Sequence, residues 1–284
     1  MAMADTSARR AAFRKLHESG CFIIPNPWDV GTARYLRHLG FKALATTSSG
    51  FSFSKGLPDA DWAVPLDDAL AHIAEIVAAT DLPVNADFES GYAHEPGAVA
   101  ENVGRCVATG VAGLSIEDAT GDPGKPLYDL GHAVERIRAA RAAIDAAGAD
   151  VMLTARAECY LVGHPDPLPE AVRRLQAYAE AGADVLYAPG PRTRGDIEAM
   201  VAAVAPKPVN ILVSSHAGLT LADIAALGAR RISVGSSLAR AAWAGFIRAA
   251  ERMAEDGSFA GFDGAVPFDD LNGFFRRDLK ERSG

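Results

Sequence analysis

The sequence predicts an α/β protein that folds as a (β/α)8 TIM barrel. Eight short apolar runs alternate with alanine-rich amphipathic segments along the chain. A short phrase with a glycine between a helix end and a strand start recurs at several junctions. One repeated strand-and-helix unit, used eight times, favours a closed parallel barrel.

The eight apolar runs have the length and composition of buried parallel strands. They lie at Cys21–Pro25, Phe41–Thr46, Pro83–Phe88, Gly113–Ile116, Val151–Ala155, Asp184–Ala188, Pro208–Val213 and Arg231–Val234. Between them, apolar residues recur with helical spacing, for example at Val172, Leu175 and Ala179. This spacing predicts helices that bury one face.

The junction phrase indicates that helices end in the same way before several strands. It reads Leu39-Gly40-Phe41, Thr109-Gly110-Val111, Ala147-Gly148-Ala149-Asp150, Ala181-Gly182-Ala183-Asp184 and Leu227-Gly228-Ala229. Glycine suits a left-handed helix end. An open doubly wound sheet could also hold eight parallel strands, but no Gly-x-Gly-x-x-Gly motif follows the first run. We therefore expect one barrel domain over residues 1–284.

Segments before and after the eight units predict two additional helices. Ala8–Leu16 has helical apolar spacing, which suits an N-terminal capping helix. The last barrel helix is expected at Leu238–Met253, and residues 255–284 form a C-terminal linker and helix. The C-terminal helix carries an apolar stripe of Phe268, Leu271, Phe274 and Phe275. The stripe either folds onto its own barrel or is exchanged with a neighbouring subunit, and we expect a homodimer or homotetramer.

Composition excludes several classes of function. The net charge of −8 and the pI near 5.4 disfavour nucleic-acid binding, which needs clustered basic residues. Three scattered cysteines indicate neither a disulfide framework nor a thiolate zinc site. No segment has the roughly 20 uncharged apolar residues that cross a bilayer. We therefore expect a cytoplasmic protein that acts on a small molecule, without membrane contact.

Polar side chains gather where the predicted strands end. Asn85, Asp87 and Glu89 alternate with apolar residues and so share one face of their strand. Glu117 ends the next strand, and Asp59 lies in a loop. Such hard oxygen ligands favour Mg2+ or Mn2+, held partly through water, over Zn2+. Alternatively, the acids are solvated or paired with arginine.

Arg156 ends the fifth strand and is expected to face the same centre. Its fork of donors suits an anionic substrate, although a structural salt bridge to Glu117 or Glu158 is the alternative. The run Thr46-Thr47-Ser48-Ser49-Gly50 offers hydroxyl and backbone N–H groups to an anion.

Two loops, Phe51–Leu66 and Ala119–Leu130, are long enough to act as lids. In the second loop, Lys125 and Tyr128 are candidates for exchanging protons or holding an anion.

These motifs together resemble the isocitrate lyase/phosphoenolpyruvate mutase superfamily, in its methylisocitrate lyase-like or phosphonomutase-like branches. The matching segments are Pro25-Asn26-Pro27-Trp28-Asp29, Ala45–Gly50, Leu57-Pro58-Asp59, Val84–Tyr92, Gly113–Asp118 and Thr154-Ala155-Arg156. The resemblance implies a (β/α)8 barrel that acts through Mg2+ on 2-oxo or 2-hydroxy carboxylates.

The resemblance also implies roles for individual residues. Ser48, Ser49 and Gly50, with Trp28, would bind the substrate, and Arg156 would bind its oxyanion. Asp59, Asp87 and Glu117 would surround the metal, together with Asn85.

Two departures from the family pattern stand out. Asn85 replaces an aspartate that commonly binds the metal, and the Ala119–Leu130 loop lacks the lyases' lid cysteine.

The leading interpretation is a Mg2+-dependent lyase that cleaves a C–C bond of a small 2-hydroxy or 2-oxo acid through an enolate. Arg156 and Glu117 are its expected catalytic residues, with Lys125 and Tyr128 on the lid. The alternatives are P–C bond chemistry of the phosphoenolpyruvate mutase type and a barrel that binds a small acid without turnover.

Overall fold

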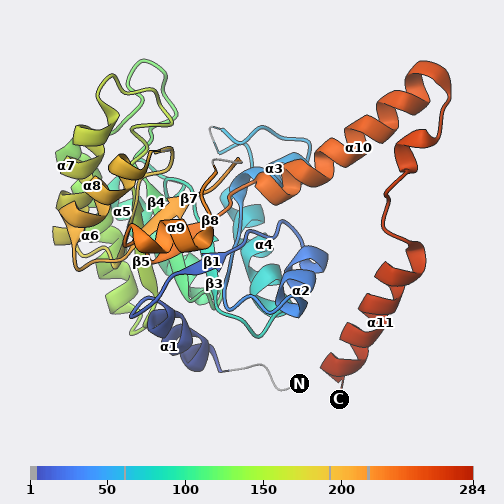
Figure 1. The fold of residues 1–284 in the computed structure, drawn as a ribbon. Helices are drawn as coiled ribbons and strands as arrows, with labels where there is room; N and C mark the ends of the chain where they lie inside the picture. Colours follow the sequence, from blue (N-terminus) through green and yellow to red (C-terminus); the bar gives the residue numbers. More distant parts are fainter. Residues whose placement is uncertain (1–4, 61, 192, 216–217, 284) are drawn as a thin grey trace. The chain divides into compact units, whose positions relative to one another are not determined.

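Eight parallel strands form the centre of the protein in the computed structural model, which describes residues 5–60, 62–191, 193–215 and 218–283 (Figure 1). The strands are β1 (Phe22–Ile24), β2 (Leu44–Ala45), β3 (Val84–Asp87), β4 (Gly113–Glu117), β5 (Met152–Arg156), β6 (Val185–Tyr187), β7 (Val209–Leu212) and β8 (Arg231–Ser233). Their order is β1-β8-β7-β6-β5-β4-β3-β2, so each strand lies beside its neighbour in the chain. All eight predicted strands and the TIM-barrel class are confirmed.

The seam between β1 and β2 is closed by isolated hydrogen bonds. The Ala45 N–H donates to the Pro25 carbonyl at 3.0 Å. Asn26 joins three strands, because its amide donates to the Thr46 carbonyl and its Oδ1 accepts from the N–H groups of Val234 and Gly235. One buried side chain therefore ties β8 and β1 to β2 where the ladder is interrupted.

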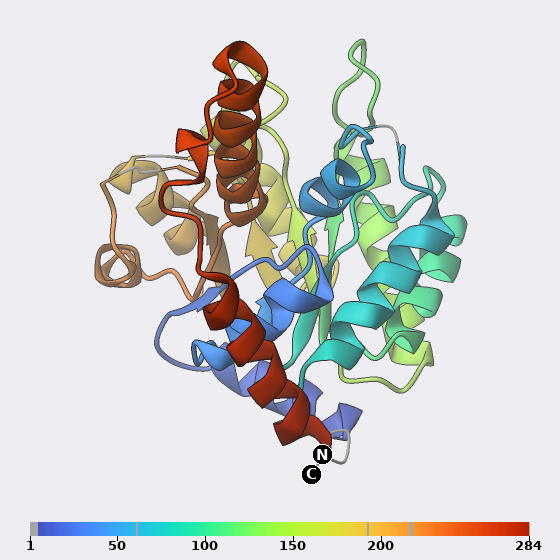
Figure 2. The ribbon, with the colours of Figure 1, turned by 90° about the vertical axis from the view of Figure 1, so that its right-hand side faces the viewer.

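Helices surround this barrel on its outside and at its two ends (Figures 1 and 2). They are α1 (Thr6–Leu16), α2 (Val30–His38), α3 (Ser48–Ser54), α4 (Leu66–Ala79), α5 (Pro96–Ala108), α6 (Leu130–Ala146), α7 (Pro167–Glu180), α8 (Arg194–Val204) and α9 (Leu221–Ala226). Several end at a glycine with positive φ, as at Gly40 and Gly110. The junction phrase therefore does mark left-handed helix ends.

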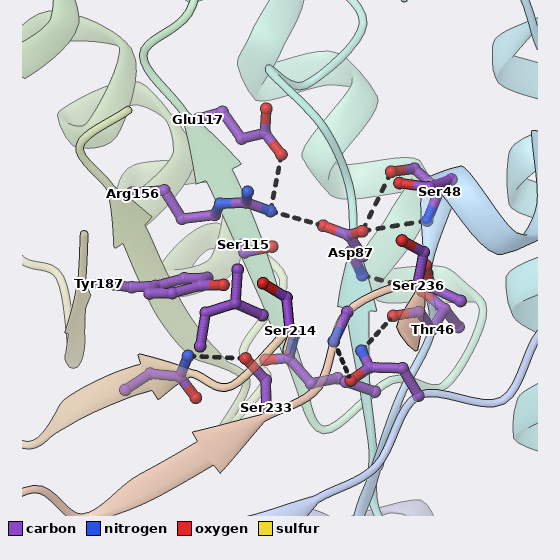
Figure 3. Close-up of a pocket in the computed structure, with 18 of the residues that line it drawn as sticks. Thr46, Ser48, Asp87, Ser115, Glu117, Arg156, Tyr187, Ser214, Ser233 and Ser236 are labelled. Atoms are coloured by element: carbon purple, nitrogen blue, oxygen red, sulfur yellow. Dashed lines mark hydrogen bonds and ion pairs between the residues drawn. The ribbon is translucent and has the colours of Figure 1, made fainter. Parts of the chain in front are cut away.

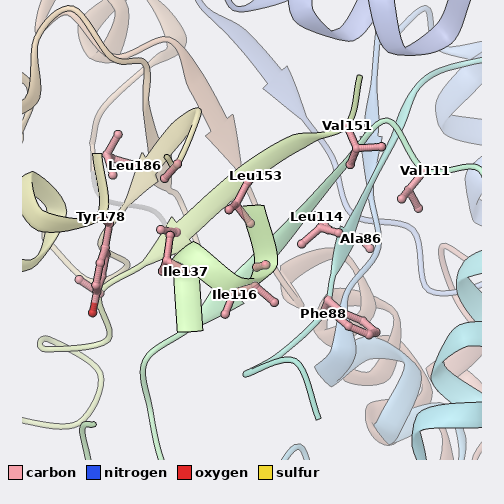
Figure 4. Close-up of a cluster of buried hydrophobic side chains, with 14 of the residues drawn as sticks. Ala86, Phe88, Val111, Leu114, Ile116, Ile137, Val151, Leu153, Tyr178 and Leu186 are labelled. Atoms are coloured by element: carbon pink, nitrogen blue, oxygen red, sulfur yellow. The ribbon is translucent and has the colours of Figure 1, made fainter. Parts of the chain in front are cut away.

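Alternation along each strand divides the core into an outer and an inner part. Leu114 and Ile116 of β4, with Leu153 of β5, face outward and pack with Ile137 of α6 and Tyr178 of α7 (Figure 4). The residues between them face the barrel interior.

The lower interior is apolar. Phe13 of α1 is fully buried with Ile24, Ala45, Met152 and Val185. The predicted capping helix therefore closes the barrel at the amino ends of its strands, and polar residues occupy the interior above it.

Residues 237–283 form a second compact unit, separate from the unit that ends at Ser236. It contains α10 (Ser237–Asp256), the short 3-10 helix η1 (Ala260–Phe262) and α11 (Phe268–Ser283). Gly261 of η1 lies so close to Ala249 of α10 that a Cβ would be 2.5 Å from the Ala249 Cα atom. The division falls before α10, whereas the sequence places the start of the C-terminal segment at residue 255. The predicted linker also contains η1.

Among the residues that the structure describes, no helix is both long and apolar enough to span a membrane.

Candidate functional site

A cavity of about 270 Å³ opens at the carboxyl ends of the strands. The last residue of each of the eight strands lines it, namely Ile24, Ala45, Asp87, Glu117, Arg156, Tyr187, Leu212 and Ser233. Ser48, Ser49 and Asp59 border it from the segment after β2. The cavity therefore lies where parallel barrels build their active sites.

Arg156 holds the upper part of the cavity together (Figure 3). Its Nη1 atom lies 2.8 Å from Asp87 Oδ1 and 2.6 Å from Glu117 Oε1. Its Nε atom donates to Glu158 Oε1 at 2.8 Å. The guanidinium carbon lies 4.9 Å from the centre of the Tyr187 ring. Arg156 therefore faces the expected centre and forms the salt bridges to Glu117 and Glu158 that the alternative interpretation expects.

Helix α3 presents its first turn to Asp87. The Thr47 side chain caps the helix by accepting from the Gly50 N–H. The Ser48 N–H and hydroxyl then donate to Asp87 Oδ2 at 3.0 and 3.1 Å. The Ser49 hydroxyl donates to Asp59 in the same way. The Thr-Thr-Ser-Ser-Gly run is thus a helix start whose donors face carboxylates in this structure.

The carboxyl groups outnumber the cations in this part of the cavity. Burial raises the pKa of Glu117 well above its usual value; Arg156 opposes the shift, while Glu158 and Asp87 add to it by repulsion. Burial likewise raises the pKa of Glu158 and of Asp59. Burial alone would lower the pKa of Arg156, but the surrounding carboxylates raise it well above its usual value. The cluster is therefore short of positive charge.

A strained loop after β3 places a further carboxyl group nearby. Glu89 and Tyr92 have φ angles of 45° and 53°, which side chains other than glycine rarely adopt. The Tyr92 hydroxyl donates to Glu89 Oε1 at 2.7 Å. Burial, with repulsion from Asp59 and Asp87, raises the pKa of Glu89 to about 7. Strain of this kind is typical of functional sites.

Arg136 of α6 fixes this loop by donating to the backbone carbonyls of Ser90, Ala93 and His94. The guanidinium of Arg136 also lies 4.2 Å from the centre of the Tyr128 ring.

The deeper interior of the cavity is polar but uncharged except for one residue. Asn85 and Ser115 line it from β3 and β4, and Asn210 and Arg231 line it from β7 and β8. Asn85 points its Oδ1 atom toward Gly113, where a Cβ would be 2.7 Å away. Among the described residues, that oxygen has no hydrogen-bond partner. Asn85 lies two residues before Asp87 on β3, so it faces the same interior but at a deeper level.

The structure brings together most of the predicted site residues. Ser48, Ser49, Asp59, Asn85, Asp87, Glu117 and Arg156 all line the cavity. Trp28 and Gly50 are not among its lining residues; Gly50 instead completes the cap of α3.

Lys125 and Tyr128 line a different pocket, with His94 and His132. Lys125 pairs there with Asp129 at 2.5 Å, and the Tyr128 hydroxyl contacts His94 Nδ1 at 2.6 Å. In this conformation, neither residue contacts Arg156.

Sequence reasoning named Glu158 only as an alternative salt-bridge partner of Arg156, and it did not assign Tyr187, Asn210 or Arg231 to the site. Glu158 follows β5, where its sequence position alone does not show whether it turns inward. Asn210 and Arg231 sit near the starts of their strands, so they are far from the strand ends in which active-site residues were sought. The alternation of side chains along a strand could have found them. Asn210 lies two residues before Leu212, and Arg231 two residues before Ser233, so each pair points to the same side of its strand.

Comparison with known proteins gives the family. The family model for phosphoenolpyruvate phosphomutase matches residues 13–254. A solved structure from Burkholderia cenocepacia J2315, named provisionally as a lyase/mutase, is 49% identical, with a TM-score of 0.91 over 95% of this chain and 97% of that one.

Two further relatives carry more specific names. The structure of 2,3-dimethylmalate lyase, described as a member of the PEP mutase/isocitrate lyase superfamily, is 27% identical over the whole of both chains with a TM-score of 0.82. The oxaloacetate decarboxylase of Paraburkholderia xenovorans is 28% identical over 83% of this chain and 77% of its own. This chain therefore belongs to the phosphoenolpyruvate phosphomutase family and is an enzyme of the isocitrate lyase/phosphoenolpyruvate mutase superfamily.

Proposed function

We propose that the protein is a divalent-metal-dependent lyase that cleaves a C–C bond in a small 2-hydroxy or 2-oxo carboxylic acid. The cluster of Arg156 with Asp87, Glu117 and Glu158 supports this proposal most strongly. It combines a fixed oxyanion-binding cation with a carboxyl group of raised pKa in one buried place. The names of two relatives, a dimethylmalate lyase and an oxaloacetate decarboxylase, agree with C–C cleavage.

The residues suit a retro-aldol cleavage. Glu117 is placed to accept the proton of the substrate hydroxyl, because its carboxylate lines the cavity beside Arg156 and burial raises its pKa and so its basicity. The C–C bond then breaks to leave a carbonyl group and an enolate; the enolate takes a proton from water on its carbon, and the proton held by Glu117 is released to solvent. Arg156 lies where it can stabilise the oxyanion, since Asp87 and Glu158 fix its guanidinium.

The donor set fits Mg2+ or Mn2+ bound largely through water. Among the described residues, no three acidic, histidine or cysteine side chains converge on one metal position. Mg2+ commonly keeps several waters and uses only one or two carboxylates. Asp87, Glu117 and Asp59 supply oxygens, whereas Asn85 lines the same cavity more deeply, with its unpartnered Oδ1 directed toward Gly113. When bound, the ion would polarise substrate oxygens as a Lewis acid.

A substrate panel tests the reaction. The protein is incubated with Mg2+ and malate-, isocitrate- and dimethylmalate-like acids, and with phosphonopyruvate, and the products are measured by NMR. Release of a 2-oxo acid from a hydroxy acid is the expected result, because the site can bind the oxyanion and accept the hydroxyl proton. Turnover of phosphonopyruvate alone would instead favour P–C chemistry. Saturable binding without any turnover would favour a non-catalytic barrel.

A second test addresses the metal. Mg2+ should raise the melting temperature of the wild-type protein, and Asp87→Ala should remove that rise because binding to the folded state is lost. Glu135→Ala serves as the control, since Glu135 is an exposed carboxylate that pairs with Arg138 outside the cavity. Melting curves with Mg2+ and with EDTA give the readout. An Mg2+ effect as large in Asp87→Ala as in the wild type would contradict the assignment.

We further propose that residues 237–283 mediate assembly into a homodimer or homotetramer. Apolar side chains on all three helices of this unit are exposed, including Phe246, Phe262, Phe268 and Leu279. Phe268 is 79% exposed. Soluble monomers rarely expose so many large apolar residues in one short segment, and a second copy of the chain would cover them.

Light scattering tests the assembly. The wild-type protein is expected to be a dimer or tetramer, and Phe268→Ser combined with Leu279→Ser should lower its mass because apolar contact area is lost. Asp269→Ser, an exposed substitution on the same helix, should leave the mass unchanged. A monomeric wild-type protein, or an unchanged mass in the double variant, would exclude assembly through α11.

A further inference from the structure

The cavity is lined by two arginines whose surroundings differ sharply. Arg156 has three carboxylate partners within 2.8 Å. Arg231, the first residue of β8, lines the deeper part of the same cavity and is 3% exposed. Among the described residues, no carboxylate forms an ion pair with Arg231. Carboxylates therefore neutralise the charge of Arg156 but not that of Arg231, which lies deeper in the cavity.

Neutral neighbours hold the Arg231 guanidinium in a fixed orientation. Its Nε atom donates to Asn210 Oδ1 at 2.8 Å, on the paired strand β7. Its Nη2 atom donates to Thr154 Oγ1 at 3.1 Å, on β5. The Asn210 amide is fixed in turn, because it donates to the Ser233 hydroxyl at 2.9 Å. Nη1 has no partner in the described part of the chain.

An unpaired buried cation is costly unless something compensates for it. Burial lowers the pKa of Arg231 to about 10, and the nearby charge of Arg156 adds to the decrease. The group therefore stays charged at neutral pH. Its field also reaches α1, where burial and then the charge of Arg231 lower the pKa of His17 to about 3. The deeper cavity thus carries a positive potential that no described carboxylate cancels.

We infer that Arg231 Nη1 binds a second anionic group of the substrate, so that the substrate is a small dicarboxylic acid. The inference rests on the proposed function, in which the substrate is a 2-hydroxy or 2-oxo acid whose oxyanion is stabilised by Arg156. Arginine is suited to this role because its planar donors match a carboxylate and it remains charged when buried. A monocarboxylate would leave Arg231 uncompensated.

Binding of two matched acids tests the inference. Malate and 2-hydroxybutyrate differ only in whether the fourth carbon is a carboxylate or a methyl group. Calorimetry in the presence of Mg2+ should show malate binding at least tenfold more tightly to the wild-type protein. Arg231→Met should abolish this preference and leave the affinity for 2-hydroxybutyrate nearly unchanged. Arg231→Lys should retain part of the preference.

Arg230→Met is the matched control, because it removes the same charge at the adjacent position. The Arg230 side chain donates to the Gly20 carbonyl outside the cavity. This variant should keep the full preference for malate. Circular dichroism establishes that each variant is folded. A folded Arg231→Met protein that still prefers malate tenfold would overturn the inference.

A crystal structure of the wild-type protein with malate covers the case in which Arg231→Met does not fold. The inference expects one malate carboxylate within hydrogen-bond distance of Arg231 Nη1, and a malate bound with both carboxylates away from Arg231 would overturn it. Both measurements read binding and not turnover. Arg231-dependent binding without cleavage of any acid would therefore uphold the inference while the proposed lyase activity failed.

Discussion

The sharing of one guanidinium among three carboxylates is the interaction on which the candidate site depends. Asp87, Glu117 and Glu158 come from or follow three neighbouring strands, and each would be an unpaired buried acid without Arg156. Breaking a buried ion pair by removing one partner typically costs about 3–5 kcal/mol. The raised pKa values of Glu117 and Glu158 indicate that even with Arg156 the negative charge is not fully compensated. This deficit makes the cavity suitable for an additional cation.

The barrel produces this arrangement through strand geometry alone. Because side chains alternate, the outward residues of β4 and β5 form the apolar layer against the helices, and the inward ones form the site. In-register pairing brings Glu117 directly beside Arg156. The same alternation places Thr154 below Arg156, where it holds Arg231. One arginine is thus paired with acids near the strand ends, while the other is left for an anion deeper in the barrel.

The sequence was sufficient for the fold and for the upper part of the site. Repeated strand and helix patterns gave all eight strands, and strand-end acids gave Asp87 and Glu117. It was insufficient for the lower part, because Arg231 begins the predicted eighth strand, whereas site residues were sought only at the strand ends. Lys125 and Tyr128 were predicted at the site but line a different pocket, because the sequence of a loop does not determine which way the loop folds. Trp28 and Gly50 belong to matching motifs but do not line the cavity.

A double-mutant cycle on Arg156 and Glu117 tests the central claim that these two groups compensate for each other. The free energy of unfolding is measured in EDTA at pH 8 for the wild type, Arg156→Met, Glu117→Gln and the double variant. The account predicts that Arg156→Met is strongly destabilising and that adding Glu117→Gln restores at least about 1 kcal/mol, because one unpaired charge is removed. The cost of Arg156→Met should also shrink at pH 5, where acids of raised pKa take up protons in the folded state. Simple additivity of the two substitutions, with no dependence on pH, would contradict the account.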